Sequence, residues 1–496
     1  MAIKVGGTEV ITNARQLSNI ASVDATTVAA LGTAGVGGGN TFEATASGAL
    51  ANGDPVIINA NGTVSKPALT ISANDPATFG YSSNSNQGTT INGTGQTQGL
   101  SAAYNSNSGT TGAGAFLVTF RDASASDALK GNMMTVRTDG ELNVEGEFSI
   151  GGETVEGNRA TDVCFNEPLN IFFIAYRKKA SDTVSVRALT PNGARTVSGG
   201  SAYTIKTDTL APRIATDNND NPYNFVVTFL ESNNSALMAK PFQYNSSNGV
   251  ITVGSEVTIE SSSCAGGHHI VYDSTNDKFI VTYANTGDNK NIKTKVITFD
   301  GSGNSLSVGS EVELSSVSVG DFNFGTVFTT SGKTVIAMKD EDNSNYLTTA
   351  IFTTSGTGGS FSSTQVAVSQ DVDNVSIGYD DNTNRVGIAF KNGGVTNTVT
   401  NFTTASVGAS SLTFQSSSPA SLGTTNSEKG SARMPFSGTN VGTTLDTART
   451  GDNKLLVVFT TQGDYGRVNI ANLGSTSTSL TSTNYIGISD AAYSDG

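Results

Sequence analysis

The segment KDEDNSNY, residues 339–346, brings together side chains that could bind a polar ligand. Asp340 and Asp342 offer carboxylate oxygens, Asn343 adds an amide, and Tyr346 adds an aromatic ring with a hydroxyl group. These groups can donate and accept the hydrogen bonds that sugar hydroxyl groups require. We therefore predict a glycan-binding site at these four residues. The alternative interpretation is a turn whose polar side chains only face solvent.

Other turns rich in Asp and Asn raise the question of calcium, which prefers oxygen ligands. The segments are DNNDN (217–221), YDSTND (272–277) and DEDNSN (340–345). None has the DxDxDG spacing with a distal Glu, and Asp and Asn in turns usually accept hydrogen bonds from nearby backbone amides. We predict hydrogen-bonded turns, with no metal site and no cofactor.

Histidine and cysteine offer little for catalysis. His268 and His269 are the only histidines, so a site with three histidines is excluded, and we interpret them as polar residues near the start of a strand. Cys164 and Cys264 are the only cysteines. They fall at different places in the repeat described below, which favours two small buried side chains over a disulfide.

A glycosidase would need two carboxylates facing each other in a cleft. The sequence does not exclude such a pair. However, the SxDxGxTW motif is missing, and Trp, the side chain that stacks best on sugars, does not occur. We therefore predict a protein that is not an enzyme and has no catalytic residues, with a carbohydrate-active enzyme as the alternative.

Composition argues against nucleic acid as a partner. The 496 residues include 28 Lys and Arg against 42 Asp and Glu, for a formal net charge of −14, and phosphate contacts need clustered basic residues. The first residues lack the apolar run of a secretory signal, and no segment approaches the roughly 20 apolar residues of a membrane span. We expect a soluble protein without membrane insertion.

A repeat accounts for most of the chain. Seven apolar segments rich in β-branched and aromatic residues recur with a period of about 54 residues and one longer spacing. They are FLVTF (116–120), IFFIAY (171–176), FVVTF (225–229), FIVTY (279–283), TVIAM (334–338), VGIAF (386–390) and LLVVF (455–459).

The flanking segments repeat as well. YDSTNDKF (272–279) is matched by YDDNTNRV (379–386), and ITVGSEVTI (251–259) by LSVGSEVEL (306–314). Each period thus holds four strands, of which the second is buried on both faces. Four strands in a period near 50 residues are typical of a β-propeller blade. We predict an all-β chain with a seven-bladed propeller at residues 99–496.

Residues 1–98 carry different patterns. In residues 1–40, Leu17, Ile20, Val23 and Leu31 form a thin apolar stripe with too few apolar neighbours to fold alone, which predicts an attachment arm. Residues 41–98 contain an apolar strand followed by the hairpin dipeptide Asn61-Gly62 and then a segment rich in Gly and Asn. They predict a small β module and a linker or long loop.

The opening MAIKVGGTEVITNARQLSNI, the segment GALANGDPVIINANGTV and the YDSTNDKFIVTY repeats followed by GSEV resemble virion structural proteins of marine bacteriophages, especially tail-fibre-like proteins of cyanophage-type viruses. The resemblance implies location in the virion, with the arm binding other virion proteins and the propeller contacting a host-surface glycan or a neighbouring subunit. It also implies a homo-oligomer, with a trimer favoured. The final NYIGISDAAYSDG resembles the edge of a module that leads into further β domains in such proteins.

Overall fold

The computed structural model describes residues 3–5, 8–11, 45–47, 49–50, 55–58, 63–65, 78–80, 89–92, 95–105, 114–136, 142–157, 161–193, 196–217, 223–233, 235–261, 263–264, 267–300, 304–381, 383–393, 400–415, 419–421, 454–460, 466–472 and 485–488. The elements in these ranges are β-strands, apart from one turn of 3-10 helix, η1 (Glu341–Asn343). The prediction of an all-β protein is confirmed. Within the described ranges, no helix is long and apolar enough to cross a membrane.

The chain divides into two compact units. The large unit comprises Ile71–Ser477, and the small unit combines Met1–Thr70 with Thr478–Gly496. These boundaries differ from the predicted ones, which gave residues 99–496 to the propeller and residues 41–98 to the small module and linker. Strand pairings at both limits of the large unit, described below, explain the difference.

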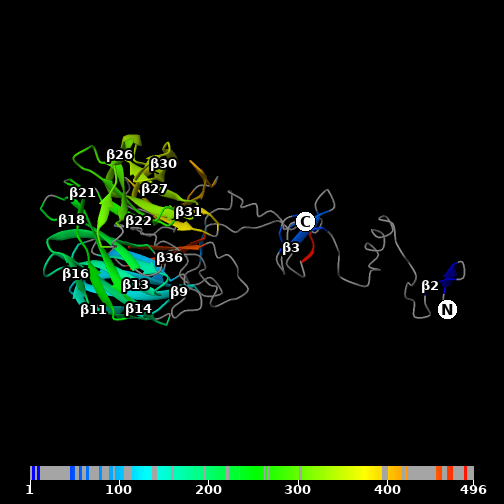
Figure 1. The fold of residues 1–496 in the computed structure, drawn as a ribbon, viewed down its shortest axis with the longest axis horizontal. Coiled ribbons are helices and arrows are strands. Elements are labelled where there is room, and N and C mark those ends of the chain that lie inside the picture. Colours follow the sequence, from blue (N-terminus) through cyan, green and yellow to red (C-terminus); the bar gives the residue numbers. More distant parts are fainter. Residues whose placement is uncertain are drawn as a thin grey trace. The chain divides into compact units, whose positions relative to one another are not determined.

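The large unit is built from antiparallel meanders of similar layout (Figure 1). Meander 1 contains β7 (Thr97–Tyr104), β8 (Ala115–Asp122), β9 (Ala128–Val136), β10 (Leu142–Val144) and β11 (Phe148–Thr154). Meander 2 contains β12 (Thr161–Asn166), β13 (Ile171–Lys178), β14 (Thr183–Asn192), β15 (Thr196–Gly199) and β16 (Tyr203–Lys206). Meander 3 contains β17 (Thr209–Thr216), β18 (Tyr223–Glu231), β19 (Leu237–Asn245), β20 (Val250–Val253) and β21 (Val257–Glu260).

The next three meanders share one continuous hydrogen-bonded sheet. Meander 4 contains β22 (His268–Asp273), β23 (Lys278–Ala284), β24 (Asn291–Phe299) and β25 (Leu306–Val308). Meander 5 contains β26 (Val312–Thr329), β27 (Lys333–Asp340), β28 (Tyr346–Ser355) and β29 (Gly358–Phe361). Meander 6 contains β30 (Gln365–Asp380), β31 (Arg385–Asn392), β32 (Thr400–Val407), β33 (Leu412–Phe414) and β34 (Ala420–Ser421). The long strands β26 and β30 join them, because each pairs first with the preceding meander and then with its own.

A seventh group of strands combines segments far apart in the sequence. β35 (Lys454–Thr460) pairs with β36 (Gly466–Asn472), and β36 also pairs with β5 (Thr78–Gly80) and β6 (Thr89–Thr90). Residues 78–90 therefore belong to the large unit, although their composition predicts a linker or loop. We refer to β35, β36, β5 and β6 as meander 7.

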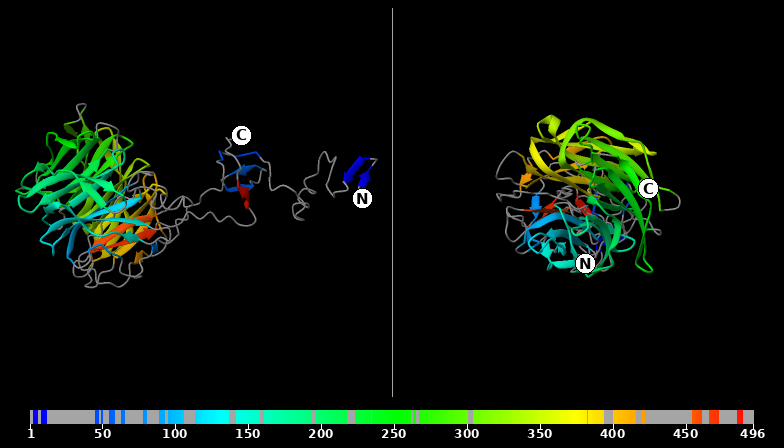
Figure 2. Two further views of the ribbon diagram at one scale, coloured as in Figure 1. Left: turned by 90° about the horizontal axis from the view of Figure 1, so that it is seen from below. Right: turned by 90° about the vertical axis from the view of Figure 1, so that its left-hand side faces the viewer.

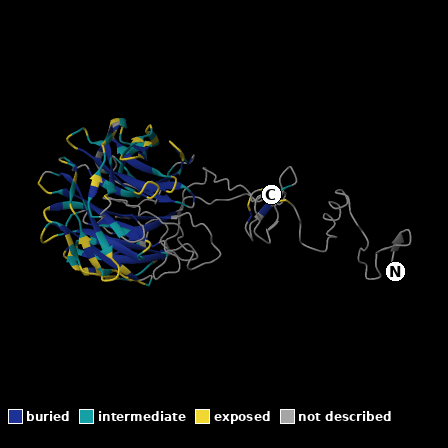
Figure 3. Cartoon of the chain, in the orientation of Figure 1, coloured by how far each residue is buried: buried dark blue, intermediate teal, exposed yellow. Residues whose placement is uncertain are grey.

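The predicted second strands are buried along most of their length. Figure 3 shows the buried residues of the large unit in dark blue. Because successive side chains of a strand point to opposite faces, each second strand serves two cores. In β13, Phe173 and Ala175 belong to a core shared with meander 3, whereas Phe172, Ile174 and Tyr176 belong to a core shared with meander 1. The run of apolar residues in the sequence thus reflects burial on both faces.

The first strands of successive meanders contact one another in order, from β7 through β12, β17, β22 and β26 to β30. β35 contacts both β30 and β7. Leu456, Val458, Val468 and Ile470 of meander 7 share a core with apolar residues of β7 and β8 in meander 1, among them Phe116. Figure 2 shows the strands of the large unit from two further directions.

The outer edge of meanders 1 to 6 is formed by two separate strand segments, and in meanders 3 and 4 the repeated GSEV lies at the break between them. A Cβ atom on Gly254 would lie 2.1 Å from the carbonyl oxygen of Asn304, and one on Gly309 would lie 1.7 Å from that of Thr357. Both carbonyls belong to the outer hairpin of the following meander. The glycines therefore allow each hairpin to pack against the break in its neighbour. Short edge pieces also leave little exposed backbone for pairing with another chain.

The small unit contains a separate two-stranded pair, β1 (Ile3–Val5) with β2 (Thr8–Ile11), and a three-stranded sheet. In that sheet β3 (Pro55–Ile58) pairs with β4 (Val64–Ser65) and with β37 (Tyr485–Ile488). The β3–β4 pair agrees with the predicted hairpin, whereas β37 falls within residues 99–496, for which the sequence predicts the propeller. The predicted arm residues Leu17, Ile20, Val23 and Leu31, and the turn residues Asn61 and Gly62, lie outside the described residues.

Candidate binding site

One end of the meanders carries the turns between second and third strands together with the segments that join successive meanders. Hydrogen bonds link the two kinds of segment: Thr286 N donates to Ser263 O at 2.7 Å, Val319 N to Lys290 O at 3.1 Å, and Val372 N to Asn345 O at 3.0 Å. We call this surface of meanders 4 to 6 the rim, defined by residues 263–264, 285–290, 318–319, 340–346 and 371–373.

The four predicted site residues all lie at the rim, but in different surroundings. Asp342 is exposed and its Oδ2 accepts a hydrogen bond from Ser318 N at 2.8 Å, and Asn343 and Tyr346 are half-buried. Asp340 is only 5% exposed, and burial raises the pKa of its carboxyl group. A raised pKa would suit a general acid, but a side chain this buried is not placed to touch a ligand. The surface part of the predicted site is therefore Asp342, Asn343 and Tyr346.

Charged contacts hold these turns in place. Lys339 Nζ lies 2.7 Å from Asp373 Oδ1 of the segment that leads into meander 6. Lys290 Nζ lies 4.0 Å from Glu341 Oε2, which joins the turns of meanders 4 and 5. Tyr346 and Asp371 are register partners on neighbouring strands. The rim thus combines exposed hydrogen-bonding groups with a backbone that is fixed from both sides.

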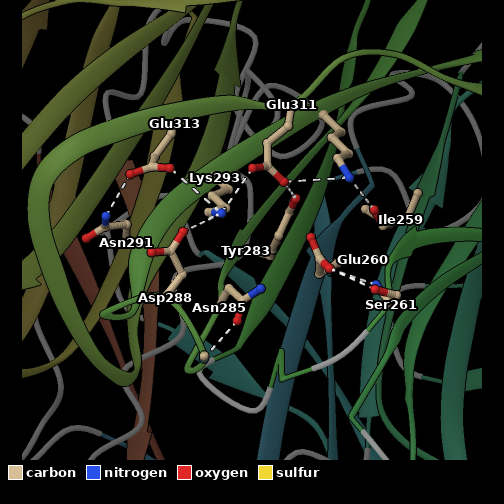
Figure 4. Close-up of polar contacts among 12 residues, drawn as sticks. Ile259, Glu260, Ser261, Tyr283, Asn285, Asp288, Asn291, Lys293, Glu311 and Glu313 are labelled. Atoms are coloured by element: carbon tan, nitrogen blue, oxygen red, sulfur yellow. Dashed lines mark hydrogen bonds and ion pairs between the residues drawn. The ribbon is translucent and has the colours of Figure 1, made fainter.

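Next to the rim, a cluster of polar contacts surrounds Lys293 of β24 and includes the rim residue Asp288 (Figure 4). Its side chain is 8% exposed, and its Nζ lies 2.7 Å from Asp288 Oδ2, 3.0 Å from Glu311 Oε1 and 3.8 Å from Glu313 Oε2. Tyr283 donates its hydroxyl to Glu311 Oε2 at 2.5 Å. Glu311 and Glu313 both belong to the segment between meanders 4 and 5. The cluster therefore fixes this segment against β24.

The protonation states follow from these contacts. Burial would lower the pKa of Lys293, but its hydrogen bonds to Asp288 and Glu311 outweigh burial and raise it. Burial would raise the pKa of Glu311, but hydrogen bonds from Tyr283 and Lys293 outweigh it and lower the pKa. Burial raises the pKa of Tyr283. The cluster is therefore an ion-paired network at neutral pH.

Replacing Lys293 with Met should lower the free energy of unfolding by about 2 kcal/mol at pH 7, because it leaves three carboxylates without their shared cation. The loss should shrink in acid. A carboxylate with a lowered folded-state pKa stabilises the fold above its unfolded pKa, and this stabilisation disappears as the pH falls through the folded pKa. Urea unfolding across the acid range measures both effects.

Lys290 provides the matched control for this substitution, since its Nζ lies 4.0 Å from Glu341 Oε2 and both side chains are about a third exposed. A Lys290→Met variant should change stability by no more than about 0.5 kcal/mol. Equal losses in the two variants, or a Lys293→Met loss that does not depend on pH, would contradict the role assigned to the cluster.

The turn at 272–277 is hydrogen-bonded as predicted, whereas residues 218–221 of the segment 217–221 lie outside the described residues. Asp273 Oδ1 accepts hydrogen bonds from the backbone amides of Thr275 and Asn276, each at 3.0 Å, and Asp380 accepts one from Thr383 N at 3.1 Å. These bonds close the turns between first and second strands. In the ranges that the structure describes, no group of three or more His, Cys, Asp or Glu side chains is arranged to hold a metal.

The histidines and cysteines occupy structural positions. His268 is buried at the start of β22, and the His269 ring meets Phe324 edge-on with centroids 5.1 Å apart. Cys164 and Cys264 do not form a disulfide; Cys264 is buried as predicted, whereas Cys164 is only half-buried. Burial raises the pKa of Cys264 to about 12.

Comparisons with known proteins do not identify a family. No protein-family model matches the chain, and neither does any curated protein sequence. Similar solved structures include Sqt1 of Saccharomyces cerevisiae (10% identity, 78% of this chain and 99% of that chain, TM-score 0.44) and the Aleuria aurantia lectin, described as a six-bladed β-propeller with a fucose recognition mode (13%, 66% and 97%, 0.41). Another is the polysaccharide lyase Uly1, with 10% identity over 81% of this chain and 98% of that chain and a TM-score of 0.40. At these scores the similarities decide neither the number of blades nor the function.

Proposed function

We propose that the large unit is a seven-bladed β-propeller in which β5 and β6 complete the last blade. The proposal is supported by the ordered contacts between first strands and by the contact of β35 with both β30 and β7. The core shared by meanders 7 and 1 supplies the apolar burial that holds such a ring closed. A rigid ring of this kind positions its loops but does not by itself define a function.

On this scaffold the rim serves as a binding surface for a polar glycan, and the protein is not an enzyme. The observation that supports this proposal most directly is the set of backbone hydrogen bonds that tie the rim turns of meanders 4 and 5 to the segments joining successive meanders. Because the turns are fixed before binding, a ligand loses little affinity in ordering them. Asp342, Asn343 and Tyr346 then offer an acceptor, an amide and an aromatic ring to a sugar.

The protein acts at the surface or tail of a bacteriophage particle. There the small unit, which includes residues 1–40, attaches it to other virion proteins. The support for this role is the sequence resemblance of residues 1–20, the GALANGDPVIINANGTV segment and the repeats. A trimeric assembly has the same support. A glycosidase acting on host glycans remains the alternative, and it differs in requiring turnover of the bound sugar.

The binding site is tested by replacing Asp342, Asn343 and Tyr346 together with Ala and measuring binding to an array of host-surface glycans. Binding should fall at least tenfold, which corresponds to about 1.4 kcal/mol, while the free energy of unfolding falls by no more than about 1 kcal/mol through loss of the Ser318–Asp342 hydrogen bond. Glu167→Ala is the matched control, because Glu167 is an exposed acidic residue in a turn between first and second strands. Equal binding by the triple variant and the parent protein would rule out this site, and release of a shortened sugar would favour the enzyme.

A further inference from the structure

The small unit takes its third strand from a distant part of the sequence. β3 and β4 are close along the chain, but β37 follows them by more than 400 residues and pairs with β3 through Pro55 and Ile488, Val56 and Gly487, and Ile57 and Tyr485. The described core of this sheet contains only Leu50, Val56 and Val64, with Ala46 packed against them. Two strands with so small a core are marginal in water, so β37 decides whether the sheet is stable.

The large unit brings the segments leading to β3 and β37 together. Asn472, the last residue of β36, and Thr78, the first residue of β5, are register partners in meander 7. Register partners in an antiparallel pair lie about 5 Å apart. One chain segment runs from Thr78 back to β3 and the other runs from Asn472 on to β37. The pairing of β36 with β5 therefore anchors both segments at one place in the large unit.

The length of the chain between β3 and β37 determines the probability that these two strands pair. When β36 is paired with neither β5 nor β6 and the large unit is open, joining Ile57 to Tyr485 closes a loop of roughly 430 residues; with both pairings formed, the loop contains only about 30. The closure probability falls as the 3/2 power of loop length, so the closed large unit favours the β3–β37 pair about 50-fold.

We propose that folding of the small unit is conditional on closure of the large unit at meander 7. The three-stranded sheet forms when β36 and β5 are paired, and it opens when they separate. If the small unit attaches the protein to the particle, which rests on the function proposed above, chains with an open large unit are excluded from assembly. The folding coupling itself does not depend on that role.

The test uses hydrogen exchange of the β3 amides in the full chain. A Gly/Ser segment of 100 residues inserted after Ser477 lengthens the loop from about 30 to about 130 residues, and should lower the protection of Val56, Ile57 and Ile58 about eightfold. The same segment inserted after residue 30 is the matched control, because it lies outside the loop, and should leave protection unchanged. Ending the chain after Ser477 removes β37 and should abolish this protection, with exchange in β8 and β13 unaffected.

If the β3 amides remain protected from hydrogen exchange after both the insertion and the truncation, the small unit folds independently of β37 and of the large unit, and the inference is wrong. Loss of protection in the control insertion would overturn it as well. Particle incorporation is measured separately. Incorporation that persists when β3 protection is lost would refute the attachment role while leaving the folding coupling intact.

Discussion

A Leu456→Ala variant should lose about 3 kcal/mol of the free energy of unfolding of the large unit. Leu456 lies on β35, is fully buried and belongs to the core shared by meanders 7 and 1. Removing its side chain leaves a cavity at the interface that closes the ring. The loss is measured by urea unfolding, and hydrogen exchange locates it.

Exchange of backbone amide hydrogens should become faster on both sides of this interface. It should rise in β35 and β36 and also in β7 and β8, which are more than 330 residues away in the sequence. Ile174→Ala, between meanders 1 and 2, serves as the comparison because its interface joins neighbours in sequence. Faster exchange confined to β35 and β36 would mean that meander 7 does not close against meander 1.

A Gly309→Ala variant should be destabilised by about 3 kcal/mol, because the new Cβ atom would overlap the backbone carbonyl of Thr357 rather than a movable side chain. The outer hairpin of meander 5 would have to move away from the break in meander 4. Thermal unfolding measures the loss.

Gly358→Ala is the matched control, since Gly358 lies beside the same hairpin and a Cβ atom there would meet nothing within 4 Å. It should change stability by less than about 1 kcal/mol. If both variants unfold at the same temperature, close packing of the hairpin does not explain the glycine of the GSEV repeat.

The part of the fold that could be predicted from sequence is the part with a strong local signal. Second strands such as β13 are buried on both faces, so their apolar runs stand out at every repeat. The strands that complete meander 7 had no such signal: β5 has three residues, β6 has two, and the surrounding residues are rich in Gly, Asn and Thr. Their assignment depends on pairing with β36, nearly 400 residues away.

In the binding site, too, the sequence does not show which residues are buried. Asp340 and Asp342 are two residues apart and look alike in the sequence, yet one is buried beneath the turn and the other is exposed. The cluster around Lys293 was missed because its glutamates come from the next segment of the chain. The repeat marks only the neighbouring Lys295, whose Nζ lies 3.6 Å from Glu311 Oε2: Lys240 and Lys295 hold equivalent register positions opposite Val227 and Val281. Each donates to a carbonyl of the preceding meander, that of Ile205 at 2.9 Å and that of Ile259 at 2.5 Å.

The most direct measurement is an experimental structure of the protein bound to the oligosaccharide that binds best on the array. We expect seven four-stranded blades, with β5 and β6 in the last one, and the sugar at the rim against Asp342, Asn343 and Tyr346. A ring of six or eight blades, or a sugar bound at the turns between first and second strands, would contradict it.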